Sequence, residues 1–204
     1  FFAGFLSAQE ESPFLGIQME STHEGAGVKV QMVIEGSAAE RSGFEIGDLV
    51  LEFDDREVEE FSVLAEWIRA RSVGEAVVIR TERDGEVIYR VAVLGDRNGA
   101  GVVPVPLAAE FEAAYRRLAW KAEALYFQGD LETLSHLADA AARSEREHRV
   151  RALEGVEEDR REVFAAELDR LLGRMSWFAS AAARGLEVPQ CLLEPEPQEE
   201  RDRR

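Results

Sequence analysis

The sequence predicts an α+β protein in which a β-rich part, residues 13–96, precedes a helical part, residues 106–188. Three observations lead to this order. Several runs in the first part are rich in β-branched residues and stop at turn residues, which is typical of strands. A Gly-rich stretch follows, and we interpret residues 97–105 as a linker. Beyond it, apolar residues recur every three or four positions, which is the spacing of amphipathic helices.

The strands of the first part are expected over residues 28–34, 48–53, 76–81 and 87–93. The last two flank Asp84-Gly85, and an Asp-Gly pair between two such runs is the strongest short hairpin signal. Two short helices interrupt the strands. Ser37 is a suitable N-cap for the first helix, which stops at Gly43. The second helix is expected over residues 61–71 and ends before a glycine.

The helical part begins with one long amphipathic helix, from about Pro106 to just before Gly129, and Asp130 can cap a second helix. The apolar stripe continues further, and Gly155 and Gly173 are points at which a helix can break or bend. A helical hairpin or a three-helix bundle would bury this stripe within the chain. Alternatively, the stripe docks a partner or forms a homo-oligomer. The spacing is not a clean heptad, which favours the local bundle.

The two ends of the chain differ from its middle. Residues 1–6 are apolar and are followed by Ser7, Ala8 and an acidic pair, which resembles the end of a secretory signal peptide. Residues 1–12 are therefore interpreted as a signal-peptide remnant or flexible N-terminus, and the protein as exported to the periplasm or cell envelope. The alternative is an ordinary buried strand or a ragged fragment end. Residues 189–204 are rich in Pro, Glu and Arg and predict a disordered acidic tail.

Composition argues against several classes of function. The formal net charge is −17, from 24 Lys and Arg against 41 Asp and Glu, which disfavours nucleic acid and anionic membranes as partners. No other apolar run approaches the ~20 residues of a transmembrane helix. One cysteine and three histidines, without a His-x3-His or His-Glu-x-x-His spacing, predict neither a metal site nor a cofactor. Ser37 lacks the Gly-x-Ser-x-Gly context of a nucleophile, so we expect no catalytic residues and no enzyme.

The order of motifs over about 80 residues of the first part resembles a PDZ domain. The arrangement is the permuted one of bacterial HtrA-type proteases, here expected in a protein without the protease domain. The matching residues are Phe14-Leu15-Gly16-Ile17, the stretch Gly36-Ser37-Ala38-Ala39-Glu40-Arg41-Ser42-Gly43-Phe44-Glu45-Ile46-Gly47-Asp48-Leu49-Val50, helix positions Leu64 and Ile68, Gly74, the hairpin Arg83-Asp84-Gly85 and Leu94-Gly95.

This resemblance implies a small, partly open β-barrel with two short helices that binds extended peptides or protein C-termini by strand addition. Gly16 would let the N–H groups of its loop point at a terminal carboxylate. The helix after Phe61 would form the second wall of the groove, with Leu64 and Ile68 in the core. The peptide-binding residues we predict are Phe14, Leu15, Gly16, Ile17, Gln18 and Met19 on the first wall, and Val63, Trp67 and Ala70 on the second.

The charge of the β-rich part predicts a peptide preference. Residues 13–96 hold 18 acidic and eight basic side chains, a net charge of −10, so we expect basic or neutral peptides to bind best, although Arg69 and Arg71 can offset the field locally. The function we infer is a non-enzymatic adaptor that captures a peptide. One alternative is the regulatory part of a larger serine protease. Another is a structural envelope protein whose groove holds its own residues 102–106 or its tail.

Overall fold

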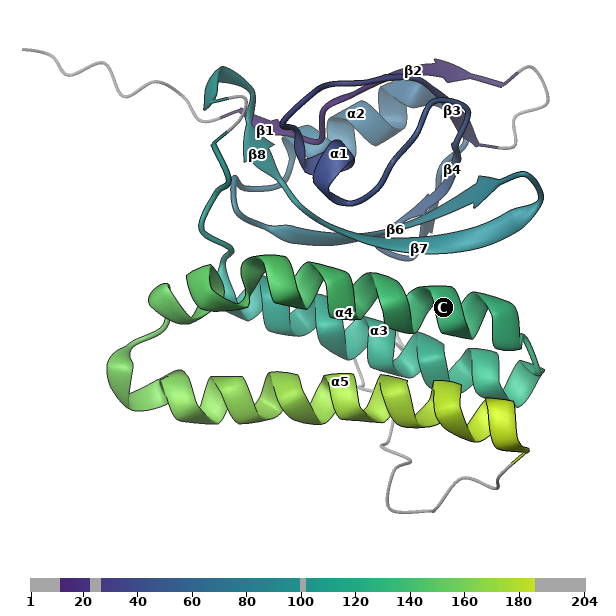
Figure 1. Ribbon diagram of the computed structural model, residues 1–204. Helices are drawn as coiled ribbons and strands as arrows, with labels where there is room; N and C mark the ends of the chain where they lie inside the picture. The colour runs from purple at the N-terminus through teal and green to yellow at the C-terminus, as the bar shows by residue number, and fades with distance from the viewer. Residues whose placement is uncertain (1–11, 23–26, 100–101, 186–204) are drawn as a thin grey trace, which may run out of the picture.

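The computed structural model describes residues 12–22, 27–99 and 102–185. A β-rich unit lies on a bundle of three long helices, two of which lie next to the sheet (Figure 1). The predicted signal-peptide remnant and the predicted acidic tail lie almost entirely outside the described residues. Within the described ranges, none of the helices is both long enough and apolar enough to cross a membrane.

The strands form one open antiparallel sheet in the order β2-β3-β4-β6-β7, with β5 paired to β4, and a separate pair of β1 with β8. Their bounds are β1 Pro13–Phe14, β2 Ile17–Ser21, β3 Val28–Val33, β4 Leu49–Phe53, β5 Arg56–Glu57, β6 Ala76–Arg83, β7 Glu86–Val93 and β8 Gly95–Asp96. The sheet does not close into a barrel, and β2 and β7 are its two edges.

The predicted hairpin joins β6 and β7. Arg83 pairs with Glu86, and Asp84 and Gly85 both have positive φ angles of 54° and 85°. This backbone suits a two-residue hairpin turn, for which Asp-Gly is a preferred pair. The two-residue strands β1, β5 and β8 were not predicted, because such short segments carry no periodic pattern.

The helices of the β-rich unit are α1 (Ala38–Arg41) and α2 (Phe61–Arg69). The predicted cap of α1 is confirmed, since the Ser37 hydroxyl accepts a hydrogen bond from the Glu40 N–H at 3.3 Å. The helical unit contains α3 (Ala108–Gln128), α4 (Leu131–Glu154) and α5 (Arg161–Arg184), with short 3-10 turns η1 (Arg97–Gly99) and η2 (Glu158–Arg160).

Of the two arrangements considered for the helical part, the structure contains the three-helix one, in which each long helix packs against the other two. The Asp130 carboxylate caps α4 by accepting a hydrogen bond from the Thr133 N–H at 3.1 Å. Gly155 does end α4, but Gly173 lies inside α5 without a break. A glycine on an exposed helix face costs only about 1 kcal/mol, which the packing of a 24-residue helix offsets.

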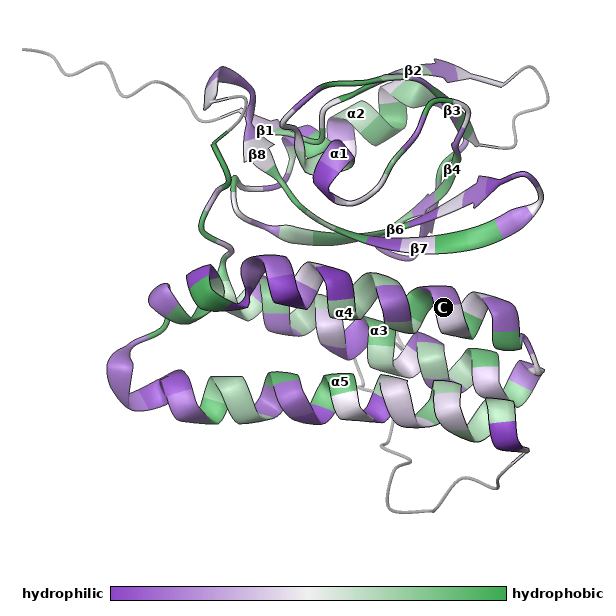
Figure 2. Ribbon diagram, in the orientation of Figure 1, coloured by the Kyte–Doolittle hydropathy of each residue, from purple (hydrophilic) through white to green (hydrophobic). Residues whose placement is uncertain are grey.

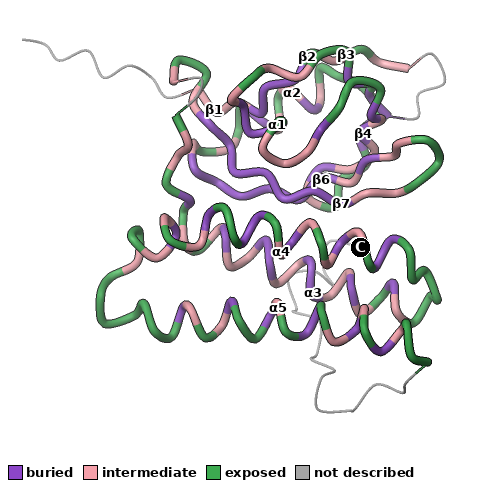
Figure 3. Tube along the Cα trace, viewed as in Figure 1, coloured by how far each residue is buried: buried purple, intermediate pink, exposed green. Residues whose placement is uncertain are grey.

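Two apolar cores share the hairpin of β6 and β7. One face of the sheet packs with α1 and α2 around Val30, Phe53, Leu64 and Ile79. The opposite face packs on the helical unit, and that second core contains the residues Val78, Tyr89, Val91, Phe111, Tyr115, Leu118, Leu134 and Leu137. Both faces of β6 and β7 are therefore buried (Figure 3), which explains why the run Ala76–Ile79 is apolar without alternation.

Ion pairs also connect the two units. Arg117 of α3 reaches Asp54 at 3.1 Å, and Lys121 reaches Asp55 at 2.6 Å. Asp54 also pairs with Arg71, which follows α2, at 3.1 Å. Apolar residues of α3 and α4 lie toward the sheet and toward α5, while polar residues cover the outer faces (Figure 2). Most of the helical stripe is thus buried within the chain, although Leu131, Val150 and Val163 are exposed.

Candidate binding groove

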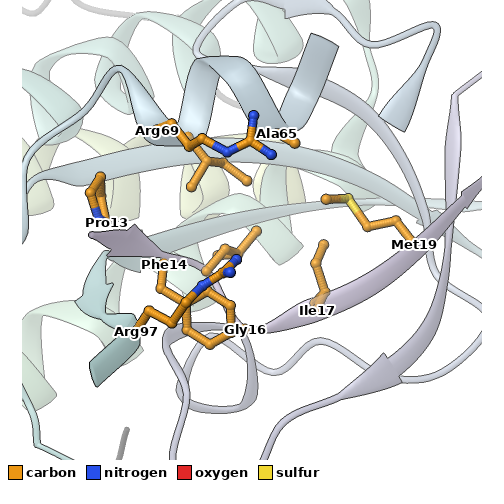
Figure 4. A pocket seen from close by; sticks show the side chains of 10 residues that line it. Pro13, Phe14, Gly16, Ile17, Met19, Ala65, Arg69 and Arg97 are labelled. Carbon is orange, nitrogen blue, oxygen red and sulfur yellow. The ribbon is translucent and has the colours of Figure 1, made fainter. Parts of the chain in front are cut away.

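A cavity of about 60 Å³ lies between β2 and α2. The loop from Pro13 to Ile17, together with Met19 of β2, forms one wall. Ala65, Ile68 and Arg69 of α2 form the other, and Arg97 lies at one end (Figure 4). The wall residues other than the arginines are apolar apart from their backbone, so the cavity suits a small apolar side chain.

The loop that enters β2 presents free backbone donors at this cavity. Gly16 has a φ of +91°, a conformation that L side chains rarely adopt. The Leu15 carbonyl accepts a hydrogen bond from the Ala39 N–H at 2.8 Å, and the Gly16 carbonyl accepts one from Ile34 at 2.9 Å. Among the described residues, no hydrogen bond uses the N–H of Leu15 or of Gly16. Two adjacent donors are therefore available to an anion.

The outer edge of β2 is open to a further strand. β2 pairs only with β3 in the sheet, so its other edge has no strand partner among the described residues. The Ile34–Gly16 bond makes Ile17 and Val33 a non-hydrogen-bonded pair of the antiparallel ladder. In such a pair, the N–H and C=O groups point away from the partner strand. The backbone of Ile17 therefore faces the groove and can pair with an extended peptide.

Five of the six residues predicted for the first wall line the cavity: Phe14, Leu15, Gly16, Ile17 and Met19. Gln18 does not, because successive side chains of a strand point to opposite faces. Its side chain is exposed on the other face of β2. Gln18 can still contribute its backbone to the strand, but not its side chain to the cavity.

The residues predicted for the helix wall lie away from this cavity. Val63, Trp67 and Ala70 do not line the cavity, and Ala65, Ile68 and Arg69 take their place. At 100° per residue, the two sets lie on opposite sides of α2. Ile68, which was assigned to the core alone, is 6% exposed; it belongs to the core and also lines the cavity. The spacing of Ala65 and Ile68 is the sequence signal for the face of α2 that lines the cavity.

Trp67 instead lies on the side of α2 that faces away from the cavity. Its ring centroid lies 6.4 Å from that of Phe53, and the Arg56 guanidinium carbon lies 5.6 Å from the Trp67 ring centroid. Trp67 therefore packs against the core that the sheet forms with α1 and α2, which includes Phe53, and it does not fill a side-chain pocket of the groove.

The segment 102–106 does not occupy the groove. The Leu107 N–H donates to the Gly74 carbonyl at 2.8 Å, and Arg151 of α4 donates to the Val103 carbonyl. A Cβ on Gly74 would overlap the Val105 carbonyl oxygen, so the segment runs tightly against Gly74. This finding corrects the alternative in which residues 102–106 fill the groove. The tail, the other candidate for self-occupation, lies outside the described residues.

A buried ion network holds the loop between α1 and β4, and sequence reasoning missed it. The Asp48 carboxylate, 0% exposed, accepts from the Arg83 Nε at 2.6 Å and from the Arg90 Nη2 at 2.9 Å. Burial alone would raise the pKa of Asp48. The hydrogen bonds from Arg83 and from the Glu45 N–H, with the charge of Arg90, hold that pKa below its usual value. Asp48 therefore stays ionised and fixes β4 to the β6–β7 hairpin.

Residues 13–89 match the PDZ domain family. None of the curated proteins matches the sequence. Among solved structures, a variant of the HtrA-type protease AlgW with a decapeptide is 23% identical, and the match covers 45% of this chain and 31% of that chain with a TM-score of 0.43. The chain thus spans about a third of the length of that protease.

Two further solved structures are similar. The HtrA3 PDZ domain bound to a phage-derived ligand is 20% identical, with coverage of 40% of this chain and 84% of that chain and a TM-score of 0.37. The serine endoprotease from Yersinia pestis is 17% identical, with coverage of 42% and 29% and a TM-score of 0.38. The family match coincides with the open sheet and the groove described above. Residues 13–89 of this chain form a PDZ domain.

Proposed function

We propose that the groove between β2 and α2 binds the C-terminal end of an extended protein segment, which adds to β2 as a further antiparallel strand. The observation that carries this proposal is the pair of free N–H groups on Leu15 and Gly16 at the end of an open strand edge. Backbone donors aimed at one point hold a carboxylate. The unpaired edge supplies the hydrogen bonds of strand addition, and these do not depend on the peptide sequence.

The cavity would select the last side chain of the peptide. Its volume of about 60 Å³ and its apolar lining suit a small aliphatic group, not an aromatic ring. Ile68 forms the floor, and Ile17 and Met19 form the side next to the incoming strand. A micromolar dissociation constant, about 8 kcal/mol of binding free energy, is expected for this mode of recognition.

The helical unit has a different task in this proposal. Its apolar stripe covers the hairpin of β6 and β7, and it therefore completes the core of the PDZ half. We propose that the described residues act by binding and not by catalysis, as a non-enzymatic adaptor outside the cytoplasm. Cell fractionation of the full reading frame tests the location. Sedimentation of the purified chain tests whether it forms a homo-oligomer through surfaces other than the buried stripe.

The test of binding uses the full chain and fluorescein-labelled heptapeptides that end in Ala-Ala-Val, with either a free or an amidated C-terminus. Fluorescence anisotropy should show micromolar binding of the free form and at least about tenfold weaker binding of the amide. Ala65→Trp should abolish binding, because Ala65 lines the cavity. Glu66→Trp, one position along the exposed side of α2, is the matched control and should bind normally. Equal affinity for both peptide forms would refute the proposal.

A further inference from the structure

The groove has the opposite charge to the rest of the molecule. The whole chain carries a net charge of −17, yet the only charged residues that line the cavity within the described ranges are Arg69 and Arg97. Arg69 extends from α2 and Arg97 from the turn after β8, so the two side chains approach the cavity from opposite sides (Figure 4). No carboxylate of the described residues lines this cavity.

Both guanidinium groups lack an acidic partner within the described part of the chain. Arg71, only two positions after Arg69, is paired with Asp54 at 3.1 Å and Glu75 at 2.9 Å. Arg69 forms no such pair with a described residue. Arg97 has its guanidinium carbon 5.0 Å from the centroid of the Phe14 ring and makes no ion pair within the described ranges. An arginine that stacks on an aromatic ring is held in place while its N–H donors stay available.

The acidic residues beside these arginines do not neutralise them. Asp96 precedes Arg97, but its Oδ1 accepts hydrogen bonds from the N–H groups of Ser12 at 3.1 Å and Asn98 at 3.2 Å. Glu66 lies one helical turn before Arg69 and is exposed, and no ion pair between them forms. The Glu20 carboxylate, on β2, accepts from the Gln31 amide at 2.9 Å. The groove therefore keeps two positive charges that the described residues around it leave unmatched.

We infer that this groove selects peptides with an Asp or Glu side chain among their last three residues, and that Arg69 and Arg97 read that carboxylate together with the terminal one. The inference rests on the proposed binding of C-termini. A neutral peptide brings one negative charge to two guanidinium groups and the backbone donors of Leu15 and Gly16. A second carboxylate balances the remaining positive charge, and Arg is well suited to bind it because of its fork of N–H donors.

This inference reverses the preference expected from the net charge of −10 over residues 13–96. Charges more than about 8 Å apart are largely screened at physiological ionic strength. The two arginines lie in the groove itself, whereas Asp48 and Asp54, among the acidic residues of this half, are committed to ion pairs elsewhere. The peptide preference therefore depends on the charges in the groove and not on the net charge of the β-rich unit.

The experiment uses the full chain and the free-carboxylate heptapeptide ending in Ala-Ala-Val. Each of its last three residues is replaced in turn by Glu or by the uncharged isostere Gln, and affinities are measured at low and at high salt. At one position or more, Glu should bind about fivefold tighter than Gln at low salt, and high salt should reduce this ratio. Arg69→Gln and Arg97→Gln should each lower the ratio, and the double variant should bring it to about one.

The matched control is Arg56→Gln, which removes the same charge from an arginine that stacks on Trp67 outside the groove. This variant should keep the Glu preference. If the Ala-Ala-Val peptide binds but Glu and Gln peptides bind equally, the charge inference fails and the proposed function stands. A Glu preference that persists in the double variant also overturns the inference. If no peptide binds, the proposed function fails and the inference fails with it.

Discussion

Gly16→Ala tests whether the loop before β2 depends on the absence of a side chain. A Cβ at this position would lie within 2.5 Å of both Cβ and Oγ of Ser37, which is 5% exposed and caps α1. The φ of +91° costs an alanine about 1–2 kcal/mol. Displacement of Ser37 removes an N-cap worth about 1 kcal/mol. We expect Gly16→Ala to lower the free energy of unfolding by about 2–3 kcal/mol and to weaken peptide binding.

Two variants separate the causes of this loss. Gly47 has a φ of +100°, and a methyl group added there would meet nothing within 4 Å, so Gly47→Ala carries the conformational cost alone, about 1–2 kcal/mol. Ser37→Gly removes the atoms that the new methyl group at position 16 would overlap, and glycine at an N-cap costs only a few tenths of a kcal/mol. Gly16→Ala should therefore be less harmful when combined with Ser37→Gly, by about 1 kcal/mol of coupling.

Urea unfolding followed by circular dichroism measures the parent protein and all four variants, and peptide anisotropy follows loop function in those that stay folded. If Gly16→Ala is no more destabilising than Gly47→Ala, the steric argument is wrong. If Ser37→Gly gives no recovery, the overlap with Ser37 is not its cause. Either result would mean that the close contact between Gly16 and Ser37 does not hold the loop in place. The free N–H groups of Leu15 and Gly16 would then owe their direction to something else.

Three further predictions concern stability. Asp48→Asn should cost about 3 kcal/mol near neutral pH in urea unfolding, because it leaves the Arg83 and Arg90 charges without their buried partner. The folded state lowers the pKa of Asp48, so the stability that its charge contributes is fully present above the unfolded pKa, about 3.9, and is lost as pH falls through the folded pKa. A difference in unfolding free energy between the two proteins that stays constant down to strong acid would contradict this reasoning. Leu137→Ala, at a fully buried position of α4, should cost about 3 kcal/mol by calorimetry, whereas Leu131→Ala, 46% exposed on the same helix, should cost under about 1 kcal/mol. Residues 12–99 expressed alone should be less stable than the full chain by on the order of 5 kcal/mol and should bind a hydrophobic dye, because the helix-facing side of β6 and β7 is uncovered; equal stability would show that the helices do not complete this core.

Much of the fold was predictable from local patterns. The Asp84-Gly85 hairpin, the Ser37 and Asp130 caps and the helix end at Gly129 were all predicted from the sequence. Each of these features depends on backbone preferences and hydrogen bonds within a few residues. The loop residues Phe14 to Ile17 were identified differently, by their resemblance to a PDZ motif, and Gly16 of this loop does have a positive φ.

Only the tertiary structure decided which face of α2 lines the groove and where the charges lie. Leu64, Trp67 and Ile68 are all apolar, so the helix pattern alone does not separate the side toward Phe53 from the side toward β2. Likewise, the sequence determined the net charge of −17, but the pairing of Arg71 and the isolation of Arg69 depend on residues distant in the chain. Periodicity specifies how a segment folds, whereas the surroundings of a side chain depend on how the segments pack.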